Sequence, residues 1–220
     1  METEDTQLQK GFALFQQGRH SSAKRIFERL IRQNPNNCDA LHYLGIVKAS
    51  TGELPEAKQL IERSLSNGRT YLPYVENYVM ILLEAGEHQR AVQLTTQTIE
   101  SMAQTEKLRY VRALSLYKLR RLEDAAKECD ALLRLAPNNF DGHVQKAVTL
   151  TEMGLYDEAL ACIERALRIN PGHAQALINK ANIVGALGKH DEAIGLYLQT
   201  LELNSFIPNA LIGLARALSA

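Results

Sequence analysis

Apolar residues in this chain fall into short stretches with helical spacing, and single glycines interrupt these stretches. Around Gly154, apolar residues lie before the glycine at Val144, Ala147, Val148 and Leu150, and after it at Ala159, Leu160, Ile163, Ala166 and Leu167. Spacings of three and four residues predict an amphipathic helix on each side of the glycine. Glycine also accepts the left-handed conformation with which many helices end. The pattern therefore predicts two helices joined by a tight turn.

The same pattern recurs every 34 residues without insertion or deletion. Alanine marks one position of each period, at Ala23, Ala57, Ala91, Ala125, Ala159 and Ala193. Five residues before it stands the turn glycine, at Gly18, Gly52, Gly86, Gly154 and Gly188, and only the fourth period differs, with Arg120. A small residue also recurs on the first helix, at Gly11, Gly45, Ala113, Ala147 and Ala181, with Val79 as the exception. Such a period predicts a stack of helical repeats.

These residues resemble the tetratricopeptide repeat, whose pattern includes Leu-Gly, a turn glycine, an alanine, aromatic residues and a closing proline. The second repeat carries Leu44-Gly45, Gly52 and Ala57, and the fifth carries Gly154, Tyr156, Ala159, Ala166 and Pro171. The resemblance implies an all-α fold, a right-handed superhelical α-solenoid of six 34-residue helix-turn-helix repeats plus a C-terminal single helix. We place the repeats at residues 4–37, 38–71, 72–105, 106–139, 140–173 and 174–207, and the single helix at 208–220.

The chain departs from the family pattern in two respects. Basic residues stand where the family usually has leucine, at Lys10, Arg112, Lys146 and Lys180. We expect their stems to lie on apolar surface with the charge in water. The third repeat has no closing proline and carries Thr95 and Thr98 at positions that are usually apolar or small. We therefore expect an irregular junction between the third and fourth repeats.

The segment after Pro208 restarts the first helix of a seventh repeat without a second helix. Two interpretations are open: a capping helix, or the end of a fragment of a longer protein. A cap normally has a polar outer face. This segment is apolar, with Leu211, Ile212, Leu214 and Leu218, which favours the fragment.

In the family that this chain resembles, the first helices line the concave face of the solenoid, where ligands bind. The sixth position of each repeat gives Gln9, Tyr43, Asn77, Val111, Gln145 and Asn179, and the ninth gives Phe12, Ile46, Met80, Leu114, Val148 and Asn182. Side-chain amides can hold an extended peptide backbone, since each offers a donor and an acceptor. An apolar stripe suits an amphipathic or apolar segment. The alternative is that the amides are ordinary surface residues and that neighbouring helices bury the stripe.

From these series we predict a peptide-binding concave face, with Tyr110 added on a nearby turn. Its residues are Gln9, Phe12, Tyr43, Ile46, Asn77, Met80, Tyr110, Leu114, Gln145, Asn179 and Asn182. Some members of the family hold the C-terminal carboxylate of chaperone tails with a set of lysines and asparagines. No three consecutive repeats supply that set here, so we do not expect this partner.

Composition narrows the remaining classes of function. Twenty-five basic and twenty-five acidic residues balance, which disfavours nucleic acid as a partner. No apolar run reaches the roughly 18 residues of a membrane span, and the start of the chain has no apolar signal segment. The three cysteines, Cys38, Cys129 and Cys162, are far apart, which fits a reducing cytoplasm. Catalytic and phosphate-binding motifs are absent, so we expect no enzyme activity, no metal and no cofactor.

Three functions follow as hypotheses. The leading one is an interaction scaffold that binds a protein, as a peptide or helix segment, in the concave groove. The second is a substrate-recognition module of a larger, glycosyltransferase-like enzyme, truncated after residue 220, because similar arrays precede transferase domains in bacteria. The third is a self-association module that uses the C-terminal helix.

Overall fold

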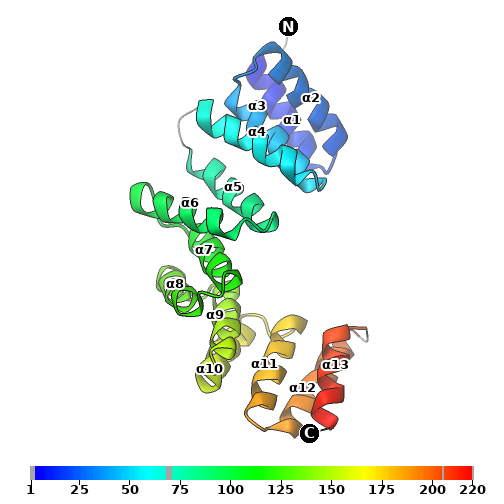
Figure 1. Ribbon diagram of the computed structural model, residues 1–220. Helices are drawn as coiled ribbons and strands as arrows, with labels where there is room; N and C mark the ends of the chain where they lie inside the picture. The colour runs from blue at the N-terminus through cyan, green and yellow to red at the C-terminus, as the bar shows by residue number, and fades with distance from the viewer. Residues whose placement is uncertain (1–2, 68–70, 205, 220) are drawn as a thin grey trace. The chain divides into compact units, whose positions relative to one another are not determined.

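The computed structural model of the chain describes residues 3–67, 71–204 and 206–219. Parts of the predicted repeats, residues 68–70, Ser205 and Ala220, lie outside the described residues. The described residues form thirteen α-helices and no strand, which confirms the all-α class. They are α1 (Glu4–Gln16), α2 (His20–Gln33), α3 (Cys38–Ser50), α4 (Leu54–Asn67), α5 (Leu72–Glu84), α6 (His88–Ser101), α7 (Glu106–Lys118), α8 (Leu122–Leu135), α9 (Phe140–Glu152), α10 (Tyr156–Ile169), α11 (Ala174–Ala186), α12 (His190–Leu203) and α13 (Pro208–Leu218) (Figure 1).

The helices form two compact parts, which we call the N-terminal part (residues 1–104) and the C-terminal part (residues 105–220). The N-terminal part holds α1 to α6, and the C-terminal part holds α7 to α13. Their boundary falls where the third repeat lacks a closing proline. The two threonines of that repeat are buried, and each hydroxyl donates to a backbone carbonyl of its own helix, Thr95 to Ala91 and Thr98 to Leu94, both at 2.7 Å. These bonds satisfy the hydroxyls where other repeats bury apolar groups.

The first helices begin at steps of exactly 34 residues, and side-chain caps contribute to where they start. The side-chain oxygen of Asn37 accepts from the Ala40 N–H at 2.7 Å. The side-chain oxygen of Asn139 accepts from the Gly142 N–H at the same distance. Such caps satisfy amide groups that the first turn of a helix leaves unpaired. The Asn139 amide also donates to Glu106, at the start of the preceding first helix, at 2.8 Å. One side chain thus caps a helix and ties it to its neighbour.

Each repeat is held together by close contact between its two helices. The six periodic alanines are at most 1% exposed, and the small residues that face them on the first helices are buried as well. At Gly45, an added Cβ would lie 2.5 Å from Ile61 Cγ1 and 3.1 Å from the Ala57 carbonyl oxygen. A Cβ here would push Ile61 and the backbone of α4 away, so glycine permits the closest approach of the two helices.

The turn between the two helices has the same backbone conformation in all six repeats. The five glycines have φ between 72° and 83°, and Arg120 has φ of 60°. A side chain in this left-handed region is strained, whereas glycine is not. The fourth repeat thus keeps the turn although it has lost the glycine.

We expect Arg120→Gly to unfold at a higher urea concentration than Arg120→Ala. Both variants remove the 2.6 Å ion pair with Glu152, so the difference between them reports the backbone strain less the greater entropy of glycine in the unfolded chain. Circular dichroism at 222 nm measures the two midpoints. Equal midpoints, or a lower one for the glycine variant, would show that the strain at this turn does not exceed the entropic cost of ordering glycine.

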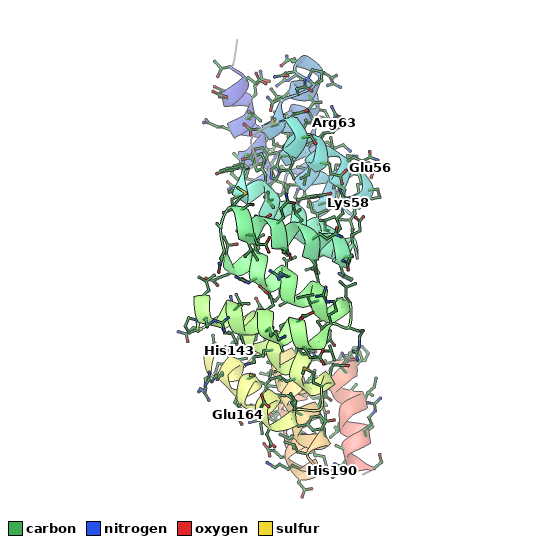
Figure 2. The ribbon with its side chains drawn as sticks, turned by 60° about the vertical axis from the view of Figure 1, so that its left-hand side comes forward. Glu56, Lys58, Arg63, His143, Glu164 and His190 are labelled. Carbon is green, nitrogen blue, oxygen red and sulfur yellow. The ribbon has the colours of Figure 1, made fainter. Side chains whose placement is uncertain are left out.

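Two of the basic residues at the seventh position of the repeat, Lys146 and Lys180, join consecutive repeats. Lys146 pairs with Asp130 of the preceding repeat at 2.6 Å. Lys180 pairs with Glu164 of α10, labelled in Figure 2, at 3.0 Å. We expected these charges to end in water, but each meets a carboxylate. Exposed pairs of this kind contribute less than about 1 kcal/mol each, so they specify the stacking more than they stabilise it.

Candidate peptide-binding surface

The first helices of the N-terminal part, α1, α3 and α5, lie side by side and leave two hollows on their shared face. The first lies between α1 and α3. It is lined by Asp5, Leu8, Gln9, Phe12, Asp39 and Tyr43. The rings of Phe12 and Tyr43 lie 5.1 Å apart, and Phe12 is 37% exposed. Three of the predicted residues, Gln9, Phe12 and Tyr43, therefore meet at one hollow with an aromatic wall.

The second hollow lies between α3 and α5. Its lining is Ile46, Ala49, Ser50, Asn77, Met80, Ile81 and Glu84. Three further predicted residues, Ile46, Asn77 and Met80, are thus brought together. Ala49, Ser50 and Glu84 follow from the helical period, because the twelfth and thirteenth positions of a repeat lie one turn beyond the ninth.

Asn77 also has a structural role beneath this face. Its amide nitrogen lies 3.2 Å from Nε2 of His42, which is fully buried. The His42 ring stacks on Tyr74, with centroids 3.6 Å apart. Burial lowers the pKa of His42 to about 4 and raises that of Tyr74, whose hydroxyl donates to Asp39 and so raises it further. The Asn77 amide is therefore shared between the surface and the packing below it.

In the C-terminal part, a hollow lies between α9 and α11. It is lined by Val148, Thr151, Glu152, Asn179 and Asn182. The carbonyl oxygen of Asn179 accepts from the Gln175 amide at 3.1 Å, and that of Asn182 accepts from the Tyr197 hydroxyl at 2.6 Å. Both predicted asparagines reach the hollow, but each already uses its acceptor within the chain.

The other three predicted residues of the C-terminal part lie on α7 and α9. Tyr110 and Leu114 are half-buried and one turn apart on α7. Gln145 is only 8% exposed, and its amide donates to the Thr149 hydroxyl at 3.3 Å. A partner has little access to this amide, so Gln145 offers little to a bound peptide.

The charges around these hollows were not anticipated from the sequence. Carboxylates line all three, from Asp5 and Asp39, from Glu84 and from Glu152, and no lysine or arginine is among the lining residues. The signal was present in the sequence, because Asp5 and Asp39 share the second position of the repeat and Glu84 and Glu152 share the thirteenth. Glu152 is paired with Arg120, so among the residues that line these three hollows, the carboxylates that form no ion pair with a described residue are those of the N-terminal part.

Three tetratricopeptide-repeat profiles match successive stretches, residues 14–76, 79–140 and 140–205, which together span most of the sequence. The chain belongs to the tetratricopeptide repeat family. For a tetratricopeptide-repeat protein, the supported role is that of a protein-interaction scaffold. Among curated proteins, none matches this sequence.

Solved structures show the same fold at low sequence identity. PilW, described as a widely conserved type IV pilus biogenesis factor, is 13% identical with a TM-score of 0.86, over 96% of this chain and 98% of PilW. Pseudomonas aeruginosa pilF is 18% identical with a TM-score of 0.81, over 97% of each chain. YrrB, described as having an unusual peptide-binding site, is 18% identical with a TM-score of 0.65, over 84% of this chain and 96% of YrrB. At these identities the likeness establishes the fold alone.

The described residues contain neither a candidate metal centre nor a membrane-spanning helix. No group of three or more histidine, cysteine, aspartate or glutamate side chains among them could hold a metal ion. Nor does any helix within the described ranges have the length and apolar character to cross a membrane.

Proposed function

We propose that this protein is a scaffold whose N-terminal part binds a polypeptide segment that is apolar and carries lysine or arginine. The observation that carries the proposal is the lining of the two hollows on α1, α3 and α5, where apolar and aromatic side chains alternate with carboxylates and no basic residue lines either hollow.

Each feature of the lining matches one property of such a segment. The Phe12 and Tyr43 rings offer apolar surface, and an aromatic face also attracts a cation within about 6 Å of its centre. Asp5 and Asp39 stand beside these rings and complement the charge of that cation. Ile46 and Met80 would hold an apolar residue, and the adaptable methionine tolerates different shapes there.

A structural neighbour supports a peptide-binding role, and the cysteines bear on where the protein acts. YrrB, which shares the fold, is described as having a peptide-binding site. We also propose that the protein acts in the cytoplasm, because its cysteines Cys38, Cys129 and Cys162 are all free. No catalytic role is proposed for its residues.

Selection from a phage-displayed library of random peptides tests the proposal. The full chain should select apolar sequences enriched in lysine and arginine. Phe12→Ala should weaken a selected peptide by about tenfold, because an exposed aromatic contact is lost without disturbing the core. Leu155→Ala, an exposed apolar residue 39% accessible at the turn before α10, is the matched control.

Charge is tested separately with Glu84→Lys at the end of α5, where a cation favours the helix. This variant should lose the basic peptides, whereas Glu100→Lys on the exposed surface of α6 should keep them. Selected peptides without basic enrichment, or binding that is unchanged in Phe12→Ala and Glu84→Lys, would refute the proposed groove.

A further inference from the structure

A basic hollow in the C-terminal part lies between the turn that joins α8 to α9 and the last turns of α10, both of which pack against α9. It has a volume of about 660 Å³, in the range of sites that hold a small ligand or a side chain with its neighbours. It is lined by Pro137, Asn138, His143, Arg165, Arg168 and Ile169. No carboxylate is among these residues, and none of them belongs to the predicted peptide-binding face. The basic hollow thus differs in charge from the three hollows described above.

The two arginines of the basic hollow stand three residues apart on α10, so they lie on the same side of that helix. Arg165 and Arg168 are both exposed, and neither forms a hydrogen bond or an ion pair with another described residue. The carboxylate beside them in sequence, Glu164, pairs with Lys180 of the next repeat instead. Two guanidinium groups, each with five N–H donors, are therefore available to a ligand.

The second repeat shows why Arg165 has no partner. The equivalent residue there, Arg63, donates to the backbone carbonyl of Pro35 at 3.2 Å. In the fifth repeat the equivalent carbonyl, that of Pro137, accepts from Nε2 of His143 at 2.9 Å. Because the imidazole occupies this acceptor, the guanidinium of Arg165 is left for an acceptor from outside the chain.

His143 also has a polar atom of its own that the fold does not satisfy. The side chain, labelled in Figure 2, is 4% exposed, and its Nδ1 has no hydrogen-bond partner among the described residues. Buried polar atoms are nearly always paired, and an unpaired one is often explained by an ion or a water molecule. An imidazole that carries a proton on both nitrogens is a cation. His143 can therefore add positive charge beneath the two arginines.

The charge and the lining of the basic hollow favour a phosphate monoester over a carboxylate. A phosphorylated side chain carries close to two negative charges at neutral pH, which match two arginines, and its oxygens accept from guanidinium groups in pairs. A carboxylate has one charge and would leave one arginine without a partner. Pro137 and Ile169 are exposed and offer apolar surface to the residues on either side of the phosphorylated one.

We propose that the basic hollow binds a phosphorylated side chain of a protein partner through Arg165 and Arg168, and that His143 keeps Arg165 available for it. A protein is the carrier that agrees with the role of this family as interaction scaffolds, and the hollow is larger than a phosphate group alone requires. The site lies within the C-terminal part and does not depend on the peptide groove of the N-terminal part.

Isothermal titration calorimetry of the full chain with a short peptide that has one phosphoserine between apolar residues tests the proposal. The natural chain should bind it, and the double variant Arg165→Gln, Arg168→Gln should bind at least about tenfold more weakly, because charge-assisted hydrogen bonds are lost. The control is Arg29→Gln, Arg32→Gln, which makes the same change at the same positions of the first repeat. Both of these arginines are exposed, and neither lines the basic hollow. An equal loss in the two double variants would reveal general attraction between charges and overturn the site.

The variant His143→Leu tests the part that the imidazole plays. The second and sixth repeats carry leucine at this position, as Leu41 and Leu177, so the fold accommodates it. The change leaves the Pro137 carbonyl to Arg165 and should weaken the phosphopeptide several-fold, with the circular dichroism of the chain unchanged. An affinity equal to that of the natural chain would overturn the role of His143.

Three further titrations identify the bound group. The same peptide with serine should not bind, the peptide with glutamate should bind at least about tenfold more weakly than the phosphopeptide, and inorganic phosphate should also bind more weakly, because it lacks the flanking residues. A glutamate peptide that binds equally well would assign the basic hollow to carboxylates, and inorganic phosphate that binds equally well would assign it to the free ion; either result overturns the proposal. Phe12→Ala should leave phosphopeptide binding unchanged, which separates this site from the groove of the N-terminal part.

Discussion

Replacing Glu128 with alanine is expected to lower the free energy of unfolding by about 2–3 kcal/mol, because it removes the carboxylate that two largely covered guanidinium groups share. The Glu128 side chain on α8 is 8% exposed. It accepts from Arg109 at 2.7 Å, and Arg112 lies 3.5 Å from its other oxygen. Arg109 and Arg112 are 13% and 25% exposed, so water replaces the lost partner poorly.

The period shows how this buried charge can be removed without loss. At the position of Arg109, the second and sixth repeats carry Leu41 and Leu177, and both are buried. Every other repeat also has an apolar residue where the fourth has Glu128. Replacing a buried ion pair by apolar residues of similar volume is often neutral or stabilising. The triple variant Arg109→Leu, Arg112→Leu, Glu128→Leu, which removes all three charges, should therefore recover most of the stability that Glu128→Ala loses.

Urea unfolding followed by circular dichroism at 222 nm compares the three proteins. Glu123→Ala, at an exposed position in the first turn of the same helix, should stay close to the natural chain and serves as the control. If Glu128→Ala behaves like Glu123→Ala, the buried charges are better hydrated than their exposure indicates.

The elements could be predicted because they depend on local chemistry that repeats. Helical spacing, a turn glycine and a closing proline recur often enough that one irregular repeat does not hide the period. Arg120 is the instructive case. The loss of the glycine looked like a break, yet the backbone at Arg120 keeps a positive φ of 60°. The packing of the neighbouring helices sets this backbone conformation, and Arg120 adopts it although it is strained for a residue with a side chain.

The surface was harder to predict, because exposure depends on contacts between helices. Gln145 occupies the same position of the repeat as Asn77 and Asn179, but it is buried whereas they are only partly covered. Basic residues such as Lys146 and Arg112 were expected to point to water, and their acidic partners lie on neighbouring helices 16 residues away in sequence. A single helical wheel does not contain those partners, so only the stacking of helices reveals them.

The second large effect is a loss of folding stability at acid pH. Lowering the pH from 7 to 4 is expected to cost the natural chain about 3 kcal/mol of stability through His42 alone. Burial lowers the pKa of His42 to about 4, while the same imidazole titrates near 6.5 in an unfolded chain. Between these values the unfolded chain binds a proton that the folded chain does not. Stability therefore falls as the pH falls through this window, and the loss is complete below about pH 4.

The variant His42→Phe separates this contribution from that of other groups. Phenylalanine can keep the stacking on Tyr74, which lies 3.6 Å from the His42 ring, but it has no proton to bind. The hydrogen bond between the His42 imidazole and Asn77 is lost, so the variant should be less stable than the natural chain at pH 7. Because phenylalanine does not titrate, the variant should lose less stability on acidification. Urea midpoints at pH 7, 6, 5 and 4 give the two slopes. An NMR titration gives the pKa of His42 directly, and a value near 6.5 would mean that the imidazole is hydrated and that the chain lacks this sensitivity to acid.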